Sequence, residues 1–280
     1  MSQTLQAANS PPAATAAMPI LSLRGVAMRF RAKGRVVQAL QETTLDIREG
    51  EFMTVVGPSG CGKSTLMNLL VGLYQPSAGS VLFRGSPVRG INRRVGYVTQ
   101  ADNLYPWRTL RANVEFPLEL RGIGRAERRE RADSLIRKVG LAGFEDNWPH
   151  ELSGGMRQRA NIIRTLAYDP EVVLMDEPFG PLDAQTRLIL QEQLLAIWQE
   201  TRKTVVFITH DLGEAVALAD RVVVMSARPG RIKAVSEVPL PRPRDLFHLH
   251  AEPAFRATYD MLWQSLEEEV KRAAPAGGAA

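Results

Sequence analysis

The feature that most constrains the fold is a glycine-rich loop between an apolar stretch and a helical one. Residues 57–64 read GPSGCGKS and match the pattern G-x-x-x-x-G-K-[ST]. The apolar run 51–56 precedes them, and residues 63–73 have the pattern of a helix. Strand, glycine-rich loop and helix, in this order, form a phosphate-binding βα unit. The sequence therefore predicts an α/β fold that binds phosphate groups.

The residue types in this loop suit a nucleotide triphosphate. Glycines let backbone N–H groups turn inward around the phosphates, and the helix N-terminus adds a positive dipole. We expect Lys63 to reach the β- and γ-phosphates and the Ser64 hydroxyl to bind Mg²⁺. The predicted nucleotide-binding residues in this stretch are Gly57, Pro58, Ser59, Gly60, Cys61, Gly62, Lys63, Ser64 and Thr65. Cys61 is the single cysteine, so it forms no intramolecular disulfide, and we assign it no redox role.

A pair of carboxylates follows a second apolar stretch, in the segment VVLMDEP at residues 172–178. Open α/β sheets bind their ligands at the carboxyl ends of the strands, where this segment places both acids. Asp176 is expected to hold Mg²⁺ through its water shell, and Glu177 to polarise the attacking water. A polar strand end or a helix cap explains the segment equally well by itself. With the glycine-rich loop upstream, the sequence predicts a P-loop NTPase.

Residues 152–156 read LSGGM and lie just before the carboxylate strand. They resemble the signature motif of ATP-binding-cassette (ABC) proteins, and the resemblance extends from about residue 20 to residue 244. Ser153, Gly154 and Gly155 can present a hydroxyl and backbone donors at a helix start, which makes a second anion cradle. The resemblance implies that this cradle closes on the γ-phosphate held by a second copy of the chain. It comprises Leu152, Ser153, Gly154, Gly155 and Met156.

Other residues match ABC motifs in the same order. Phe30 is similar to the aromatic residue that stacks on adenine, and Gln100 to the switch glutamine that touches Mg²⁺ and the attacking water. His210 resembles the switch histidine, which contacts the γ-phosphate and pairs with Glu177. The resemblance thus implies catalytic roles for Glu177, His210 and Gln100, and metal binding by Ser64, Gln100 and Asp176. It also implies a dimer-interface loop formed by Gly180, Pro181, Leu182 and Asp183.

Two positions depart from the usual family pattern. Pro181 stands where the family more often has a small flexible residue, and Met156 replaces the commoner glutamine. Neither residue supplies a phosphate-binding group, so both departures are compatible with ATP hydrolysis.

The pattern along the chain predicts the domain organisation. Residues 1–19 and 273–280 are expected to be disordered tails, and the first has no signal-peptide pattern. Residues 20–250 are expected to form the ABC ATPase domain, with a mainly parallel core sheet and an N-terminal antiparallel β subdomain. A helical insertion is expected at about 101–164, an extended proline-rich segment at 228–244, and a C-terminal helix at 251–272.

Charge and hydropathy narrow the range of partners. The net charge is +5, but the basic residues are scattered, and acidic residues interrupt their one concentration at helical spacing. A solvated helix face explains that concentration better than a nucleic-acid site, so we expect no nucleic-acid partner. The chain has no apolar run of about 18 residues, the length that a spanning helix requires. We therefore expect other chains to cross the membrane.

Met156 and the segment 226–244 are similar to the nitrate, sulfonate and taurine importer branch of the ABC family. The resemblance implies an ATPase subunit at the cytoplasmic face of the inner membrane, with ATP and Mg²⁺ as cofactors. Its implied partners are a second copy, integral-membrane permease subunits and, indirectly, a periplasmic substrate-binding protein. Two alternatives remain open: a soluble ABC ATPase of nucleic-acid repair or translation, and the ATPase subunit of an exporter.

The segment LYPW at residues 104–107 has two interpretations. It resembles the groove that receives a short cytoplasmic helix of the membrane subunit. Alternatively, Tyr105 and Trp107 pack the insertion's own core. We hypothesise that ATP closes two copies head to tail, that closure moves this groove, and that hydrolysis reopens the dimer.

Overall fold

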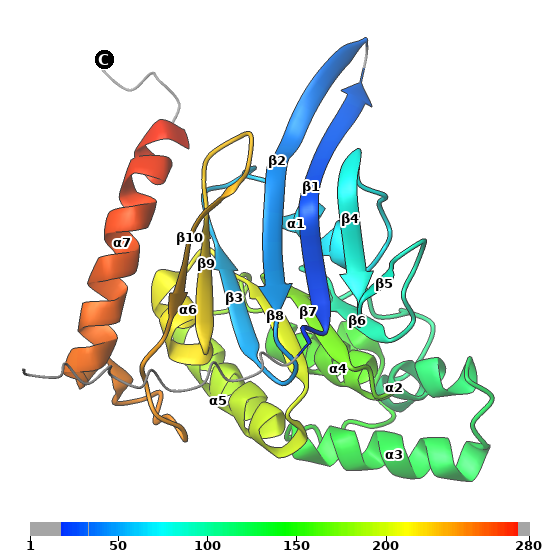
Figure 1. Ribbon diagram of the computed structural model, residues 1–280. Helices are drawn as coiled ribbons and strands as arrows, with labels where there is room; N and C mark the ends of the chain where they lie inside the picture. The colour runs from blue at the N-terminus through cyan, green and yellow to red at the C-terminus, as the bar shows by residue number, and fades with distance from the viewer. Residues whose placement is uncertain (1–17, 33, 274–280) are drawn as a thin grey trace, which may run out of the picture.

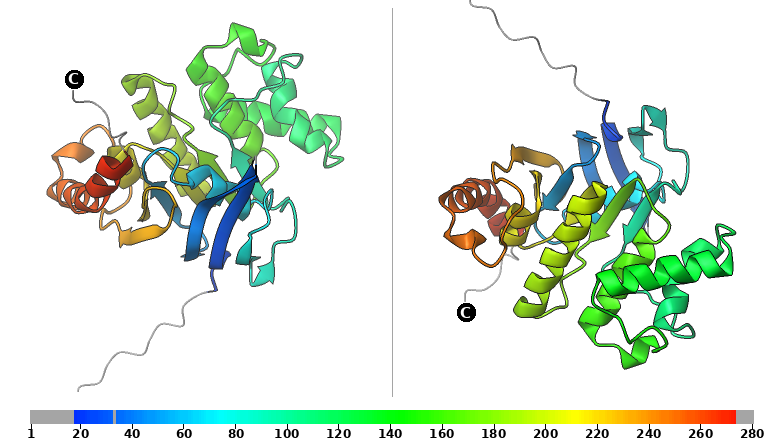
Figure 2. Two further views of the ribbon diagram at one scale, coloured as in Figure 1. Left: turned by 90° about the horizontal axis from the view of Figure 1, so that it is seen from above. Right: turned by 90° about the horizontal axis from the view of Figure 1, so that it is seen from below.

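The computed structural model describes residues 18–32 and 34–273, so nearly all of the two predicted tails lies outside the described residues. The described chain has two sheets and a separate group of helices (Figure 1). α7 (Pro253–Ala273) lies at one end of the molecule, and the helices α2 (Leu110–Glu119) and α3 (Arg125–Lys138) lie at the other (Figure 2).

The larger sheet is mainly parallel, as the sequence predicts. Its order is β10 (Ile232–Glu237), β9 (Arg221–Met225), β3 (Phe52–Val56), β8 (Thr204–Ile208), β7 (Val172–Asp176) and β6 (Val95–Val98). Neighbouring strands run parallel except β10, which is antiparallel to β9 and lies within the predicted extended segment. The carboxyl ends of β3, β6, β7 and β8 therefore meet at one edge of the sheet.

The smaller sheet is the predicted antiparallel β subdomain. Its order is β2 (Arg35–Ile47), β1 (Leu21–Ala32), β4 (Ala78–Phe83) and β5 (Ser86–Pro87). β1 and β2 form a long hairpin, in which Ala32 pairs with Arg35 close to the tip. α1 (Lys63–Leu70) packs between the two sheets, where Leu66 shares a core with Leu45 and Val55. The helix ends at Leu70, earlier than predicted, where the chain turns at Val71.

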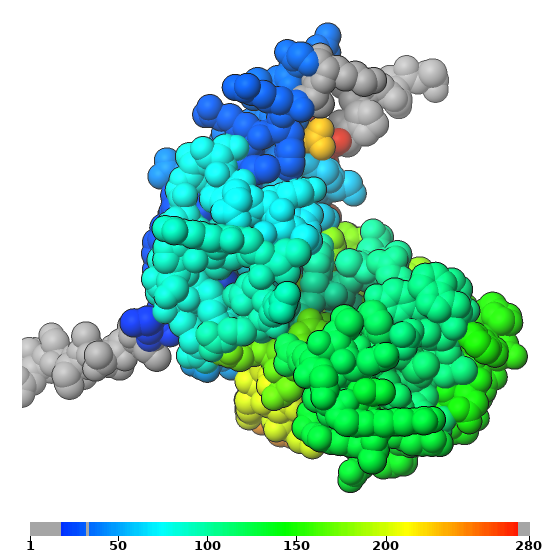
Figure 3. Space-filling model, turned by 90° about the vertical axis from the view of Figure 1, so that its right-hand side faces the viewer, coloured from blue at the N-terminus to red at the C-terminus, as the bar shows by residue number. Residues whose placement is uncertain are grey.

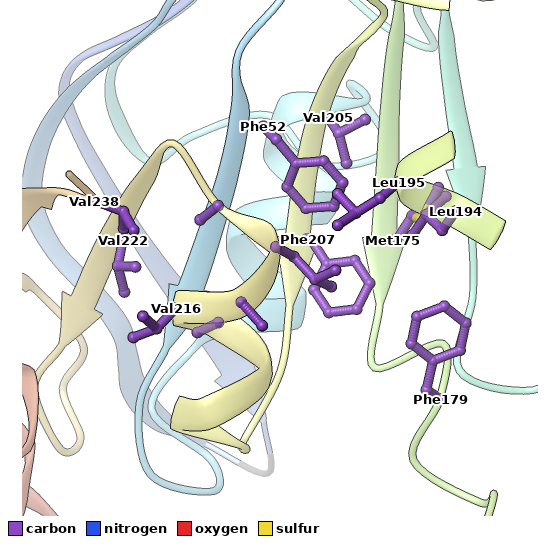
Figure 4. Packing of buried hydrophobic residues seen from close by; sticks show 14 of the residues in the cluster. Phe52, Met175, Phe179, Leu194, Leu195, Val205, Phe207, Val216, Val222 and Val238 are labelled. Atoms are coloured by element: carbon purple, nitrogen blue, oxygen red, sulfur yellow. The ribbon is translucent and has the colours of Figure 1, made fainter. Parts of the chain in front are cut away.

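The opposite face of the larger sheet is covered by helices from the second half of the chain. These are α5 (Ala184–Thr201), α6 (Leu212–Leu218) and α7 (Pro253–Ala273), with a short 3₁₀ helix, η2 (Leu249–Ala251), before α7. Figure 4 shows Phe52, Phe207 and Leu195 packed in this core. Phe52 belongs to it and Met53 to the core around α1, since successive strand residues point to opposite faces.

The predicted helical insertion is present as a lobe below the antiparallel sheet (Figure 3). It contains α2 (Leu110–Glu119), α3 (Arg125–Lys138), the 3₁₀ helix η1 (Pro149–Glu151) and α4 (Gly154–Leu166). The lobe has its own core, which includes Leu118, Ile136 and Ile163. α4 joins it to the rest of the molecule, because the neighbouring Ile162 packs in the core of the larger sheet.

The basic residues of α3 are solvated, as predicted from their spacing. Arg131 pairs with Glu127 one turn earlier, and the cluster lies on the surface. Within residues 18–32 and 34–273, no helix combines the length and the apolar character needed to cross a membrane.

A buried ion pair lies at one end of the larger sheet, and its arginine also bonds to the antiparallel sheet. Arg221, at the start of β9, places Nη1 3.0 Å from each carboxylate oxygen of Glu51 and also donates to the carbonyl of Asp46 at 3.1 Å. Both side chains are almost completely buried. Without Glu51, the buried Arg221 guanidinium keeps only the exposed Glu237 carboxylate, 3.7 Å away, as an ionic partner, which is costly.

We therefore expect Glu51→Ala to lower the free energy of unfolding by about 3–5 kcal/mol, measured by urea denaturation. Glu49→Ala is the matched control, because Glu49 pairs with Arg84 at an exposed site. Its cost should stay below about 1 kcal/mol. Equal losses in the two variants would contradict this role for the Glu51–Arg221 pair.

Candidate functional site

The glycine-rich loop joins β3 to α1, as the sequence predicts. Lys63 is buried, and its Nζ donates to the carbonyls of Gly57 at 2.8 Å and Pro58 at 3.2 Å. Gly62 caps α1 with φ of +107°, a conformation that favours glycine. A Cβ atom there would lie 2.8 Å from a methyl carbon of Leu40 in β2. The loop therefore curls around the lysine and is held against the antiparallel sheet.

A cavity of about 470 Å³ opens over this loop, and we call it the phosphate cavity. It brings together many of the residues predicted from sequence motifs: Phe30, Ser59, Gly60, Gly62, Lys63, Ser64, Thr65, Gln100 and Glu177. The structure adds Val37, Ala39 and Arg228, which no motif identified. Cys61 does not line the cavity; it is buried behind the loop, and burial raises the pKa of its thiol.

Asp176, at the end of β7, lies beside Ser64. Burial raises the pKa of the Asp176 carboxyl, and hydrogen bonds from Ser64 and Tyr97 partly offset this rise. Tyr97 in β6 donates its hydroxyl to Asp176 Oδ2 at 3.3 Å. Sequence reasoning missed Tyr97, because it lies in the middle of a strand and outside every motif. A cation bound beside the buried Asp176 carboxylate would offset the cost of burying its negative charge.

The donor set suits Mg²⁺. No group of three or more His, Cys, Asp or Glu residues capable of holding a metal occurs in the described part of the chain. Mg²⁺ does not need one, because it is commonly bound by one or two carboxylates together with water and substrate phosphates. One carboxylate, one hydroxyl and the Gln100 amide above a phosphate-binding loop fit this pattern.

Glu177 follows directly and has φ of +46°, which is strained for a residue with a side chain. Its N–H donates to the carbonyl of Ile208 at 3.0 Å. Its Oε2 lies 3.3 Å from Nδ1 of His210, which follows the end of the neighbouring strand β8 by two residues. The predicted Glu177–His210 pair is therefore formed, and the strained turn directs the carboxylate toward the phosphate cavity.

Phe30 lies at the end of the cavity lined by Val37 and Ala39. Its ring meets that of Tyr74 at a centroid distance of 5.5 Å and an angle of 77°. This edge-to-face contact is favourable for aromatic rings and restrains the Phe30 ring. Stacking of Phe30 on adenine stays a prediction.

The signature residues lie outside the phosphate cavity of their own chain. Ser153 caps α4 and accepts a hydrogen bond from the Met156 N–H at 3.3 Å. Ser153 and Gly154 are exposed, whereas Leu152 is buried and Gly155 packs against Thr186 of α5. Ser153 and the start of α4 therefore face solvent, and their use as an anion cradle stays a prediction.

The predicted interface loop also packs within its own chain. Leu182 is buried in the core of the larger sheet, and Asp183 caps α5 by accepting the Thr186 N–H at 3.0 Å. Pro181 is exposed and Gly180 partly so. Two of the four predicted interface residues thus have structural roles, and contact with a second copy stays a prediction.

The segment after Gln100 is attached to the signature helix α4. Arg157 donates from Nε to Asp102 at 2.9 Å, and Arg164 donates to the carbonyl of Asn103 at 2.8 Å. Asn161 donates to the carbonyl of Thr99 at 3.4 Å. Movement of α4 would therefore move the residues that follow Gln100.

The two aromatic residues of the LYPW segment fit different interpretations. Tyr105 packs on Phe116 of α2 with a ring centroid distance of 4.8 Å, so it belongs to the insertion's own packing. Trp107 is 69% exposed. Asn113 fixes the segment by bonding both the N–H and the carbonyl of Tyr105. Trp107 is thus an exposed aromatic residue close to a segment that hydrogen bonds hold in place.

α6 begins two residues after His210. Asp211 caps this helix by accepting the Glu214 N–H at 3.0 Å. The Glu214 side chain is buried and accepts from Gln191 at 2.8 Å. Burial raises the pKa of the Glu214 carboxyl above its usual value of 4.5.

The folded chain therefore retains the Glu214 proton at pH values where the unfolded chain has lost it, so stability falls as pH rises through this window. Glu214→Gln should remove that loss of stability. As pH rises from 4 to 8, the free energy of unfolding of the parent chain should fall relative to that of Glu214→Gln. Urea denaturation across this range measures the difference. The exposed Glu192→Gln is the control, and a pH-independent difference for Glu214→Gln would contradict the prediction.

Comparisons with known proteins agree with this geometry. The family described as ABC transporter matches residues 40–180. An uncharacterized ABC transporter ATP-binding protein of Methanocaldococcus jannaschii is 54% identical over 225 residues, covering 80% of this chain and 84% of the relative. The taurine import ATP-binding protein TauB of Yersinia pestis is 46% identical over 213 residues, covering 76% and 82%.

Solved structures give the same result. A dimeric structure of the ATP-binding cassette MJ0796, in a post-hydrolysis state with ADP and Pi, has a TM-score of 0.71 and 32% identity. The match covers 79% of this chain and all of that one. The chain therefore belongs to the ABC transporter family, as an ATP-binding and ATP-hydrolysing member.

Proposed function

We propose that this chain is the ATPase subunit of an importer, in which two copies close head to tail around ATP and hydrolysis separates them. The observation that carries the proposal is the position of Ser153 and Gly154. They are exposed at the start of α4, where they make a candidate anion cradle, and they do not line their own phosphate cavity. A second copy can supply this cradle to the γ-phosphate.

Mg²⁺ would be held by the Ser64 hydroxyl, the Asp176 carboxylate and the Gln100 amide oxygen. When bound, it supplies positive charge that stabilises the developing charge on the phosphates. Lys63 binds the β- and γ-phosphates once ATP replaces the loop carbonyls as its partners. The phosphate loop orients the chain of phosphates through its N–H groups.

Glu177 is the carboxylate placed to orient and polarise the attacking water. His210, 3.3 Å away, holds the Glu177 carboxylate and can reach the γ-phosphate. Hydrolysis of ATP needs positioning and charge stabilisation more than covalent chemistry, and these two residues meet that need.

Coupling to transport follows from the attachment of the Gln100 segment to α4. The hydrogen bonds of Arg157 and Arg164 make the signature cradle and residues 101–103 one body. Closure on ATP would then move the exposed Trp107, which we propose contacts a cytoplasmic helix of a membrane permease. The chain would act as a peripheral subunit at the cytoplasmic face of the inner membrane.

A small oxidised sulfur or nitrogen compound is the proposed cargo: an aliphatic sulfonate, taurine or nitrate. The support comes from relatives named as taurine import ATP-binding proteins, at 40–46% identity. The transported compound would be captured by a periplasmic substrate-binding protein and would not touch this chain.

Glu177→Gln tests the ATP-sandwich dimer. The variant should bind ATP, lose roughly a hundredfold or more in hydrolysis rate, and accumulate as a dimer in light scattering. The control is Glu171→Gln, which changes an ion-paired carboxylate at the amino end of β7, the opposite end of the strand from Glu177, and should hydrolyse ATP normally. A Glu177→Gln chain that binds ATP yet stays monomeric at high concentration contradicts head-to-tail closure.

Tyr97→Phe tests the metal assignment. Losing the hydroxyl that supports Asp176 should raise the Mg²⁺ concentration for half-maximal ATP hydrolysis roughly tenfold, with little change in the maximal rate. Tyr259→Phe on α7, distant from the cavity, is the control. An unchanged Mg²⁺ requirement in Tyr97→Phe would remove Tyr97 from the metal site.

Affinity purification of the tagged chain from gently solubilised host membranes tests the transport role. A multi-span permease should co-purify, and its binding protein should bind taurine, sulfonates or nitrate. Recovery of ribosomes or DNA-processing proteins without a membrane protein would favour a soluble ABC ATPase. A permease without any binding protein would favour an exporter.

A further inference from the structure

The loop between β9 and β10, residues 226–231, is tied at its base. The Ser226 N–H donates to the Arg231 carbonyl at 2.9 Å, and the Arg231 N–H donates to Ser226 Oγ at 3.1 Å. None of the ABC motifs falls in this loop. Its closed base gives the residues at its tip a defined position.

The loop packs directly on the phosphate loop. A Cβ atom at Gly230 would lie 1.8 Å from the carbonyl oxygen of Cys61, so only glycine fits there. The Gly230 N–H donates to Ala39 at 3.0 Å, and its carbonyl accepts the Gln41 N–H at 2.8 Å. The 226–231 loop is therefore wedged between β2 and the phosphate loop.

Arg228, at the tip, lines the phosphate cavity. Its Nε donates to the carbonyl of Gly60 at 3.2 Å, and no ion pair joins it to a carboxylate in the described part of the chain. Lys63 and Arg228 are the two cationic residues in the cavity lining. A guanidinium has several N–H donors, so Arg228 can hold Gly60 and still donate to phosphate oxygens.

The residue before Arg228 is held by the C-terminal helix. Glu269 of α7 is 2% exposed, and its Oε2 accepts the Ala227 N–H at 2.9 Å. Its Oε1 lies 3.1 Å from Nζ of Lys233 and 3.4 Å from Nη1 of Arg272. These contacts lower the pKa of the Glu269 carboxyl, so it stays charged at neutral pH. A buried carboxylate of α7 thus lies one peptide unit from a cavity-lining arginine.

We propose that Arg228 donates hydrogen bonds to the phosphate chain of ATP in this cavity, and that Glu269 is the positioning residue that fixes Arg228 through Ala227. The inference rests on the proposed use of the phosphate cavity for ATP. It gives the C-terminal helix a role in nucleotide binding. Guanidinium–phosphate hydrogen bonds are charge-assisted and stronger than neutral ones, so their loss is measurable.

The first test is ATP affinity, measured as the equilibrium Kd of a fluorescent ATP analogue. Arg228→Ala should weaken binding by about ten- to a hundredfold, and Arg228→Lys should recover part of the loss. KM for ATP should rise with little change in kcat, because the contact is made equally before and during hydrolysis. Arg231→Ala is the matched control: an exposed arginine of the same loop, outside the cavity, with no effect expected.

The second test is a double-mutant cycle for Glu269. Glu269→Ala should weaken ATP binding in the same direction and less strongly, and Glu269→Gln, which keeps an acceptor oxygen, should weaken it least. Adding Glu269→Ala to the Arg228→Ala variant should cause little further loss of ATP affinity. Adding it to the Arg231→Ala variant should cause the same loss as Glu269→Ala alone. A purely structural role of Glu269 would instead give additive losses. Thermal unfolding of each variant confirms that it folds.

The outcomes distinguish the claims about Arg228, about Glu269 and about ATP binding in the cavity. Unchanged ATP affinity and KM in Arg228→Ala would overturn the phosphate contact while leaving the proposed function intact. Additive effects of Arg228→Ala and Glu269→Ala would overturn the positioning role. A parent chain that binds no ATP would overturn the use of the cavity for ATP, and both inferences with it.

Discussion

The rest of the structure depends on how the phosphate loop is held around Lys63. The ammonium group bonds two carbonyls of its own loop, and the loop is wedged between elements that come from distant parts of the chain. Gly62 lies against Leu40, and Cys61 lies against Gly230. Because both contacts exclude a Cβ atom, the loop cannot relax without disturbing a sheet. Such preorganisation lets backbone N–H groups bind phosphates at little entropic cost.

The second constraint is that the signature residues of one copy do not line its own phosphate cavity. The carboxylates and the glycine-rich loop meet at one edge of the parallel sheet, whereas the signature cradle opens to solvent at the start of α4. Arg157 ties that helix to Asp102, close to Gln100. One rigid lobe thus carries both a candidate γ-phosphate cradle and a candidate permease contact. Under the proposed function, this connection would transmit the binding of ATP between two copies to a membrane subunit.

Sequence reasoning identified the phosphate loop, the carboxylates and the switch residues because each lies at or just after the end of a strand of the larger sheet. Parallel strands end at one edge, so residues such as Asp176 and His210 come together whenever the sheet forms. Tyr97 and Arg228 could not be found this way. Tyr97 reaches Asp176 from within a strand, and Arg228 depends on how a hairpin loop packs on the phosphate loop. Likewise, only the packing of the larger sheet shows that Leu182 is a core residue.

The measurement that tests the central claim most directly is the rate of ATP hydrolysis per chain as a function of protein concentration, with light scattering on the same samples. If a complete site needs two copies, the rate per chain should rise with concentration in parallel with the dimer fraction. A constant rate per chain over a range in which only monomer is present would contradict the account, because one copy would then suffice for catalysis.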